Sequence, residues 1–306
     1  MARMQSQLIA DELEKAHPGL QIEMVIIKTT GDEITDRPLH ELGGKGLFVK
    51  ELELALLNGE VDFAVHSFKD LPMTMPLMDE SKLAIAAVPK REDVRDVLIT
   101  RPGFTATSLA TLPAGATVAT GSLRRRCQIL QRRSDVHVHP IRGNIDTRIR
   151  RLHEDESPSD AVILAMAGLR RAALFDAEQM FPIEVQELLP AAGQGALALQ
   201  CRGDAQETKK FLSTLHDLQT AQCVETERRL VALLEGDCHS PIAAFAQIEG
   251  QSLYLRAAVG GRNGQPPVIF AESSGPIGKK DTAKDCCDKL LAKGASHLLH
   301  WDEGNA

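Results

Sequence analysis

The chain has 306 residues, a formal net charge of -7, 43% hydrophobic residues and 25% charged residues. This length favours two or three compact domains, and no apolar run approaches the roughly 20 residues that a helix needs to span a bilayer. The acidic balance argues against general nucleic-acid binding, which depends on a broad positive surface.

The six cysteines show no CxxC pair and are too sparse for a disulfide scaffold, so free thiols in a reducing compartment are expected and no zinc site is predicted. The first 20 residues contain Asp11, Glu12, Glu14 and Lys15 without an apolar block, which is not the pattern of a secretory signal. We therefore expect a cytoplasmic protein that neither enters a membrane nor binds nucleic acid.

Helical spacing of apolar residues predicts a helix over residues 6 to 16, ended by His17-Pro18-Gly19 and followed by an extended run, Met24 to Ile27. A second amphipathic helix contains Phe48 and Leu52 and stops at Asn58-Gly59. Two short strands are predicted at residues 62 to 65 and 83 to 88. This alternation indicates a mainly parallel sheet covered by helices.

A second alternating set indicates another α/β unit, with strands at Val97, 116 to 119, 136 to 139 and 161 to 166. Turn-rich segments at 89 to 91 and 190 to 193 bracket it, which favours a paired hinge. After it come a helix at 225 to 234, strands at 243 to 248, 253 to 259 and 268 to 271, and a helix at 284 to 292. We expect three domains, formed by residues 1–89 with 193–216, by 90–192, and by 217–306.

Arginines gather where strands of the second unit give way to helices. The segment T-G-S-L-R-R follows the strand at 116 to 119, and its small capping residues can open a helix that presents N–H groups and the guanidinium groups of Arg124 and Arg125. Arg142 and Arg148 follow the next strand, and Arg171 follows a third. Because arginine binds carboxylates and phosphates with two hydrogen bonds, this pattern predicts a ligand with several acid groups. The alternative for arginines on helices is a solvated face, which we assign to Arg132, Arg133, Arg150 and Arg151.

A second candidate site is V-H-S-F-K-D-L-P (65 to 72), after a predicted strand end. Lys69 could pair with an acidic substituent, and Asp70 could stabilise positive charge or relay a proton. A surface ion pair at a strand terminus is the alternative, and His66 fits a packed, hydrogen-bonded group better than a metal ligand. The loop G-G-K-G (43 to 46) lacks the P-loop spacing.

Cys238 lies in the turn-rich segment E-G-D-C-H-S-P (235 to 241) beside an imidazole, so a reactive thiol is one reading. The other is a buried apolar cysteine, which most lone cysteines are, and the carboxylate of Asp237 disfavours a thiolate.

In combination these segments resemble the porphobilinogen deaminases, also called hydroxymethylbilane synthases, over nearly the whole chain. The motifs are T-T-G-D (29 to 32), G-G-K-G-L-F-V-K-E-L-E (43 to 53), V-H-S-F-K-D-L-P (65 to 72), T-G-S-L-R-R (120 to 125), I-R-G-N-I-D-T-R (141 to 148), A-G-L-R-R (167 to 171), A-A-G-Q-G-A (191 to 196) and L-E-G-D-C-H-S-P-I (234 to 242). Eight motifs in the same order make the resemblance specific.

The resemblance implies an α/β fold, with two domains like those of type II periplasmic binding proteins joined by a paired hinge, and a smaller C-terminal α+β domain. It implies that Cys238 holds a dipyrromethane cofactor through a thioether, that four porphobilinogen molecules are added with loss of ammonia, and that hydrolysis releases the linear tetrapyrrole. Asp70 would be catalytic. Cofactor contacts would come from Ser67, Lys69, Asp70, Thr120, Gly121, Ser122, Arg124, Arg125 and Arg148. Substrate contacts would come from Arg142, Arg148, Arg171, Gln194 and Gly195.

Three departures from the family pattern stand out. Gly121 occupies a position where many members have serine, and Asp237 replaces a common glycine. The family's first strand and its T-R-x-S turn are not in the sequence, and we expect that the translation start was assigned too far downstream. The family implies a monomer. The competing hypothesis is a noncatalytic two-domain binder of small polycarboxylates, which a covalently occupied Cys238 would exclude.

Overall fold

The computed structural model describes residues 1–27, 49–73, 78, 81–154, 157–237, 240–278 and 281–299. The chain forms two compact units. Unit 1 comprises Met1–Arg91 and Ala196–Gln222, and unit 2 comprises Glu92–Gly195 and Cys223–Ala306. Within the described ranges, no helix has the length and apolar character required to cross a membrane.

Unit 1 is built on a three-stranded sheet in the order β1-β8-β2, whose pairs are both antiparallel. Helix α1 turns Ile9 and Leu13 toward a core that also contains Leu199 from the central strand. The predicted first helix is therefore confirmed, whereas the described sheet of this unit is not parallel. Its elements are α1 (Ala2–Ala16), α3 (Lys50–Leu57), β1 (Phe63–Ser67), a short 3-10 helix (Phe68–Asp70), β2 (Leu83–Ala87), β8 (Leu197–Arg202) and α7 (Gln206–Ser213).

The apolar run at Met24 to Ile27 forms no strand in the structure. Met24, Val25 and Ile26 are 39%, 55% and 66% exposed, so their side chains lie on the surface. A strand needs a neighbouring backbone to complete its ladder, and the described residues provide none here. Local β-propensity alone was not enough to build the predicted strand.

The first part of unit 2 contains a five-stranded sheet in the order β5-β4-β6-β3-β7. Strands β5, β4 and β6 are parallel, whereas β3 runs antiparallel to both β6 and β7. The predicted parallel alternation is thus correct for one half of the sheet. The elements are β3 (Asp96–Thr100), β4 (Thr117–Ala119), α4 (Leu123–Arg132), β5 (His137–His139), α5 (Ile145–Leu152), β6 (Ala161–Ala165), α6 (Met166–Arg171) and β7 (Met180–Ile183).

Alternate residues of the central strands supply two separate cores, one on each face of this sheet. Leu98 and Ile163 pack on the face that contacts Ile129 of α4. Val97 and Ile99 pack on the opposite face, together with residues of α5 and α6. A strand buried on both faces reads as a continuous apolar run, which explains why the sequence V-L-I in β3 shows no polar alternation.

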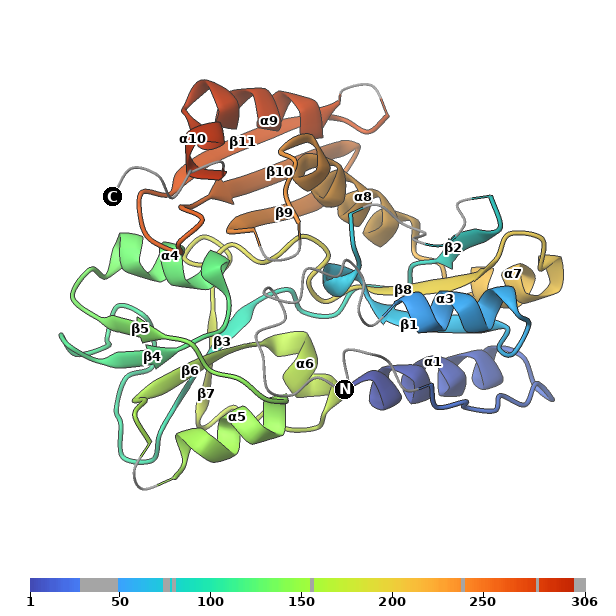
Figure 1. Cartoon of the computed structure of the whole chain (residues 1–306), viewed down its shortest axis with the longest axis horizontal. Coiled ribbons are helices and arrows are strands. Elements are labelled where there is room, and N and C mark those ends of the chain that lie inside the picture. The colour runs from blue at the N-terminus through green and yellow to red at the C-terminus, as the bar shows by residue number, and fades with distance from the viewer. Residues whose placement is uncertain are drawn as a thin grey trace. The chain divides into compact units, whose positions relative to one another are not determined.

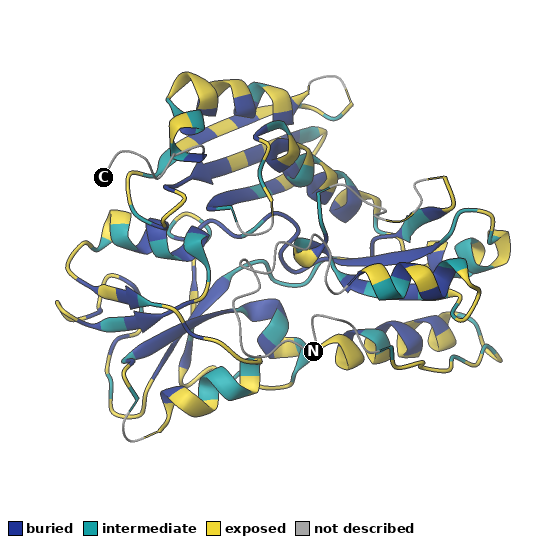
Figure 2. Cartoon of the chain, viewed as in Figure 1, coloured by how far each residue is buried: buried dark blue, intermediate teal, exposed yellow. Residues whose placement is uncertain are grey.

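The C-terminal part of unit 2 is a three-stranded antiparallel sheet, β11-β10-β9, with helices α9 and α10 on one face (Figure 1). Buried and exposed residues alternate along β11 and the first part of β10, visible as bands of colour in Figure 2. This smaller domain of strands and helices confirms the expected α+β tail. Its elements are β9 (Ile242–Glu249), β10 (Ser252–Val259), β11 (Ile269–Pro276), α9 (Thr282–Ala292) and α10 (Ala295–Leu299). Helix α8 (Leu218–Leu233) begins in the last residues of unit 1 and continues into unit 2.

Candidate functional site

Three arginine-bearing segments of unit 2 begin at one edge of the five-stranded sheet. Strands β5, β4 and β6 are parallel, so their carboxyl ends share that edge. Helices α4 and α6 follow β4 and β6, and α5 follows β5. Ligand-binding groups of α/β proteins gather at such edges. The structure therefore brings together the segments that the sequence identified separately.

The turn before α4 is organised by two hydroxyl groups. Ser122 is the N-cap, and its Oγ accepts from the backbone N–H of Arg125 at 3.4 Å. The buried Thr120 accepts from the N–H of Ser122 at 3.2 Å. Gly121 between them is exposed, and a Cβ there would lie 3.1 Å from the carbonyl oxygen of Ile141. Glycine thus lets this turn approach the segment that carries Arg142.

Arg124 and Arg125 are buried side chains that converge on Asp96 at the start of β3. Arg124 donates to one carboxylate oxygen at 2.9 Å, and Arg125 donates to the other at 2.8 Å. Gln194 donates to the same carboxylate at 2.8 Å. Arg124 also donates to the carbonyl of Leu189. Sequence reasoning placed these arginines on a ligand but missed Asp96.

Asp96 is fully buried, and its ionisation reflects two opposing effects. Burial raises its pKa, but the charges and hydrogen bonds of Arg125 and Arg124 outweigh burial and lower the pKa to about 2. Burial lowers the pKa of Arg124 although Asp96 opposes this, and the like charge of Arg125 adds to the decrease. One carboxylate therefore faces two cations. An aspartate at the head of an otherwise apolar strand was the signal that could have identified Asp96.

Arg148 adds a third guanidinium group to this region. Burial lowers its pKa, and the positive charge of Arg125 lowers it further. Its Nε donates to the carbonyl of Gly143 at 2.7 Å. Gly143 has φ +108, and a Cβ there would lie 2.8 Å from Thr147, so this turn requires glycine. Arg142 is exposed, and its carbonyl accepts from Arg151.

Gln194 and Gly195 lie where the chain leaves unit 2. Besides Asp96, Gln194 donates to the carbonyl of Val94 at 2.6 Å. The carbonyl of Gly195 accepts from Arg171 at 2.7 Å and from the N–H of Glu92 at 3.1 Å. Both predicted substrate residues at this turn are therefore held to the start of β3 and the end of α6. Arg171 is only partly buried.

Ser67, Lys69 and Asp70 belong to unit 1. Ser67 ends β1, and its Oγ exchanges hydrogen bonds with the Gln5 side chain at 2.8 and 3.0 Å. Lys69 is partly buried and Asp70 is exposed, both in the short 3-10 helix after β1. The N–H of Phe68 donates to the carbonyl of Ala196 at 3.1 Å. The strand end thus presents an accessible carboxylate.

Cys238, the predicted attachment point, lies outside the described residues, and so does His239. The residues on either side are described. Asp237 accepts from the N–H and the Oγ of Ser240, each at 2.8 Å, and its own N–H donates to Ser240 Oγ at 3.0 Å. Aspartate in place of the family's common glycine therefore adds two side-chain hydrogen bonds to Ser240.

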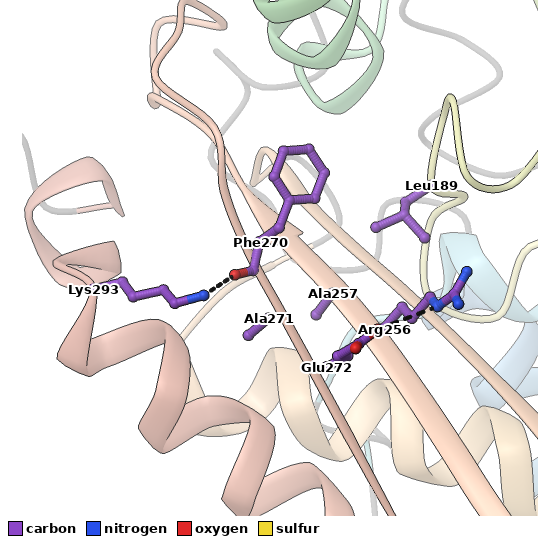
Figure 3. Close-up of a pocket in the computed structure, with 7 residues that line it drawn as sticks. All are labelled: Leu189, Arg256, Ala257, Phe270, Ala271, Glu272 and Lys293. Carbon is purple, nitrogen blue, oxygen red and sulfur yellow. Dashed lines mark hydrogen bonds and ion pairs between the residues drawn. The ribbon is translucent and has the colours of Figure 1, made fainter.

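A hollow of about 310 Å³ lies on the C-terminal sheet (Figure 3). Arg256 pairs with Glu272 at 3.6 Å, and Lys293 donates to the carbonyl of Phe270 at 2.7 Å, so its charged groups bind one another or the backbone. It contains none of the predicted site residues. The lining comprises Leu189, Arg256, Ala257, Phe270, Ala271, Glu272 and Lys293.

The charge balance at the strand ends fits a ligand with carboxylate groups. Arg124, Arg125 and Arg148 carry three positive charges, and Asp96 supplies one negative charge to the first two. Within the described residues, the buried Nε of Arg125 has no hydrogen-bond acceptor. Fold and charge together define an α/β protein suited to bind an acidic ligand.

Sequence comparison identifies the family. The family domain described as porphobilinogen deaminase, dipyromethane cofactor binding domain, matches residues 1–210, and the porphobilinogen deaminase C-terminal domain matches residues 221–294. A porphobilinogen deaminase of Xanthomonas campestris pv. campestris (strain B100) is 42% identical over 300 residues, covering 98% of this chain and 95% of that protein. The chain belongs to the porphobilinogen deaminase family and is a transferase of tetrapyrrole biosynthesis.

Similarity to solved structures is weaker. The periplasmic aliphatic sulphonate binding protein SsuA from Escherichia coli is 14% identical with a TM-score of 0.37, covering 97% of this chain and 90% of that one. The periplasmic VFT2 domain of Bordetella pertussis BvgS is 19% identical with a TM-score of 0.37, covering 71% and 79%. Family membership rests on the sequence matches alone.

Proposed function

We propose that the chain condenses four porphobilinogen molecules head to tail onto a dipyrromethane attached to Cys238, with release of ammonia, and then hydrolyses the product to hydroxymethylbilane. The family match and the excess of guanidinium charge at the strand ends of unit 2 support this function. Each pyrrole carries an acetate and a propionate, so a growing chain accumulates carboxylates that need cationic partners.

The residues of unit 2 fit a cofactor with several carboxylates. When bound, the dipyrromethane supplies a covalent attachment point from which the chain is extended. Arg148 and the Nε of Arg125 offer positive charge and a donor that Asp96 does not satisfy. Thr120, Gly121 and Ser122 offer hydroxyl and backbone groups beside them. We assign Arg124 a second task, which is to hold Asp96 and thereby fix the start of α4 against β3.

Substrate contacts are proposed for Arg142, Arg148 and Arg171, and for Gln194 and Gly195 in the turn at 191 to 195. Arg142 is exposed and Arg171 partly so, which leaves both accessible to carboxylates of porphobilinogen. The guanidinium of Arg171 donates to the carbonyl of Gly195, which follows Gln194 in the chain. We propose that this turn orients the incoming ring.

Asp70 is proposed as the catalytic residue. Loss of ammonia from the aminomethyl group leaves positive charge shared with the pyrrole nitrogen, and a carboxylate nearby would lower that barrier. Asp70 is exposed at the end of β1, where it can meet a ligand without burying an unpaired charge. Ser67 and Lys69 would bind acid side chains there.

Three broader features are part of the same proposal. Residues 1–89 with 193–216, residues 90–192, and residues 217–306 would form three domains, the third carrying the cofactor cysteine. The protein would act as a monomer, as the family implies, and it would work in the cytoplasm.

The direct test is incubation of the purified protein with porphobilinogen, with ammonia and hydroxymethylbilane measured over time. We expect both products from the wild type, and at least about 100-fold slower formation of both by the Asp70→Asn variant. A wild-type protein that binds porphobilinogen but releases no ammonia would support a noncatalytic binder of polycarboxylates instead.

A further inference from the structure

A chain of three buried polar side chains links α3, β8 and β1 within unit 1. Glu53 of α3 and Gln200 of β8 are 0% exposed, and His66 of β1 is 6% exposed. Gln200 donates from Nε2 to Glu53 Oε1 at 2.8 Å, and its Oε1 lies 3.0 Å from His66 Nε2. None of these residues has a task in the function proposed above.

The directions of these hydrogen bonds fix the state of His66. Both side-chain oxygens of Glu53 accept hydrogen bonds, one from Gln200 and the other from the N–H of Met78, so the amide nitrogen of Gln200 faces Glu53 and its oxygen faces the imidazole. Nε2 of His66 therefore carries the proton. Burial, opposed by the Gln200 hydrogen bond, lowers the pKa of His66 to about 4, so the ring is neutral near pH 7. A neutral donor at Nε2 completes the chain.

Residues on both sides of Asp70 are linked by hydrogen bonds to this one carboxylate. His66 immediately precedes Ser67, where the 3-10 helix with Lys69 and Asp70 begins. On the far side, Glu53 Oε2 accepts from the backbone N–H of Met78 at 2.8 Å. Glu53 is thus linked to His66 through Gln200, and to Met78 by a direct hydrogen bond.

Burying polar side chains costs more free energy than burying apolar side chains of similar size. A buried polar chain is therefore explained best by a geometry that its hydrogen bonds define. Here the hydrogen bonds lie at His66, before Asp70 in the chain, and at Met78, after it. We propose that Glu53 is a positioning residue, which acts through Gln200 and His66 to hold Asp70 where it meets porphobilinogen. This inference rests on the proposed catalytic role of Asp70.

The test exchanges the two partners. Glu53→Gln alone leaves two donors facing the single side-chain oxygen at position 53, and Gln200→Glu alone sets two carboxylates against each other. The double variant E53Q/Q200E regains the hydrogen bonds described above with the two side chains exchanged. The N–H of Met78 donates to the amide oxygen now at position 53, the amide nitrogen there donates to the carboxylate now at position 200, and His66 donates to that same carboxylate. Glu60→Gln is the control, because Glu60 is exposed and its side chain accepts only a local hydrogen bond from Asn58 in the described structure.

We expect each single variant to lower kcat about tenfold or more, because small misplacements of catalytic groups have effects of this size. KM for porphobilinogen should change less than kcat. The double variant should recover most of the lost kcat, and its His66, now beside a carboxylate, should titrate in NMR spectra above the value of about 4 in the wild type. Glu60→Gln should match the wild type.

The measurements separate this inference from the proposed function. Ammonia release by the wild type tests the function, and intact mass confirms that each variant carries its cofactor. Single variants that are loaded, folded and fully active would overturn the role of Glu53 while leaving the function standing. A double variant that does not fold, or that folds with the low kcat of the single variants, would overturn it equally, since that variant restores the hydrogen bonds of the polar chain.

Discussion

Replacing Asp96 by asparagine removes the negative charge from the centre of unit 2. The carboxylate is 0% exposed and accepts from Arg124, Arg125 and Gln194. Asparagine offers one oxygen in its place and turns an N–H group toward a guanidinium. Two buried cations then lack their counter-charge, which costs about 3–5 kcal/mol in comparable buried pairs.

The pH dependence of the free energy of unfolding measures the interaction of Asp96 with the two arginines in a second way. The folded pKa of Asp96 is about 2, against an ordinary value of 3.8. A difference of roughly two pKa units corresponds to about 2–3 kcal/mol of free energy of unfolding. Because the folded pKa is the lower one, this stabilisation is present above about pH 4 and is lost as the pH falls from there through about 2.

The assay is urea unfolding of the wild type and Asp96→Asn from pH 7 down to pH 2, followed by circular dichroism. We expect the difference in free energy of unfolding between the two proteins to be largest at neutral pH. It should decrease by about 2 kcal/mol as Asp96 becomes protonated. Asp135→Asn, which removes a 45% exposed carboxylate from its pair with Arg133, should change stability and its pH dependence much less. A difference in free energy of unfolding that stays constant across the whole pH range would refute the claim that the charge of Asp96 stabilises the fold.

Three further outcomes follow from the site. Asp70→Asn should lower kcat about 100-fold or more while the intact mass still shows bound cofactor, and an unchanged rate of ammonia release would remove Asp70 from catalysis. Arg148→Gln should raise KM for porphobilinogen about tenfold, because a charge-assisted hydrogen bond is lost. The urea midpoint should not fall, because the substitution also removes repulsion with Arg125. A large loss of stability with unchanged KM would contradict this prediction. Gly143→Ala should destabilise by about 1–3 kcal/mol through its positive φ and the contact with Thr147. Gly103→Ala, at φ +78 in open space, should cost less, and equal losses at the two glycines would show that Thr147 adjusts freely.

Periodicity and turn residues predicted most elements of the fold, because the governing signals are local. The helix from Ala2 to Ala16 and the strands of the C-terminal sheet lie within a few residues of their predicted positions. The arginine segments were predicted to follow strand ends, and the parallel strands β5, β4 and β6 bring those ends to one edge. Strand β8 was missed, although it is the centre of the sheet in unit 1. Its sequence, L-A-L-Q-C-R, is short and apolar, and periodicity cannot distinguish such a run from a buried helix.

The partners of the candidate residues could not be predicted, because they come from distant parts of the chain. Arg124 and Asp96 are 28 positions apart, and Gln200 meets Glu53 across 147. Tertiary pairing also decides whether an apolar run becomes a strand, as the exposed Met24 and Val25 show. The arginines were predicted as ligand-binding residues from their residue type and position. Only the fold revealed that Arg124 and Arg125 share the carboxylate of Asp96.

Peptide mapping of freshly purified wild-type protein by mass spectrometry tests the central claim most directly. We predict that the peptide containing Cys238 carries the mass of a dipyrromethane, and that Cys238→Ser protein shows neither this addition nor release of ammonia from porphobilinogen. An unmodified Cys238 peptide from wild-type protein that makes hydroxymethylbilane would contradict the account.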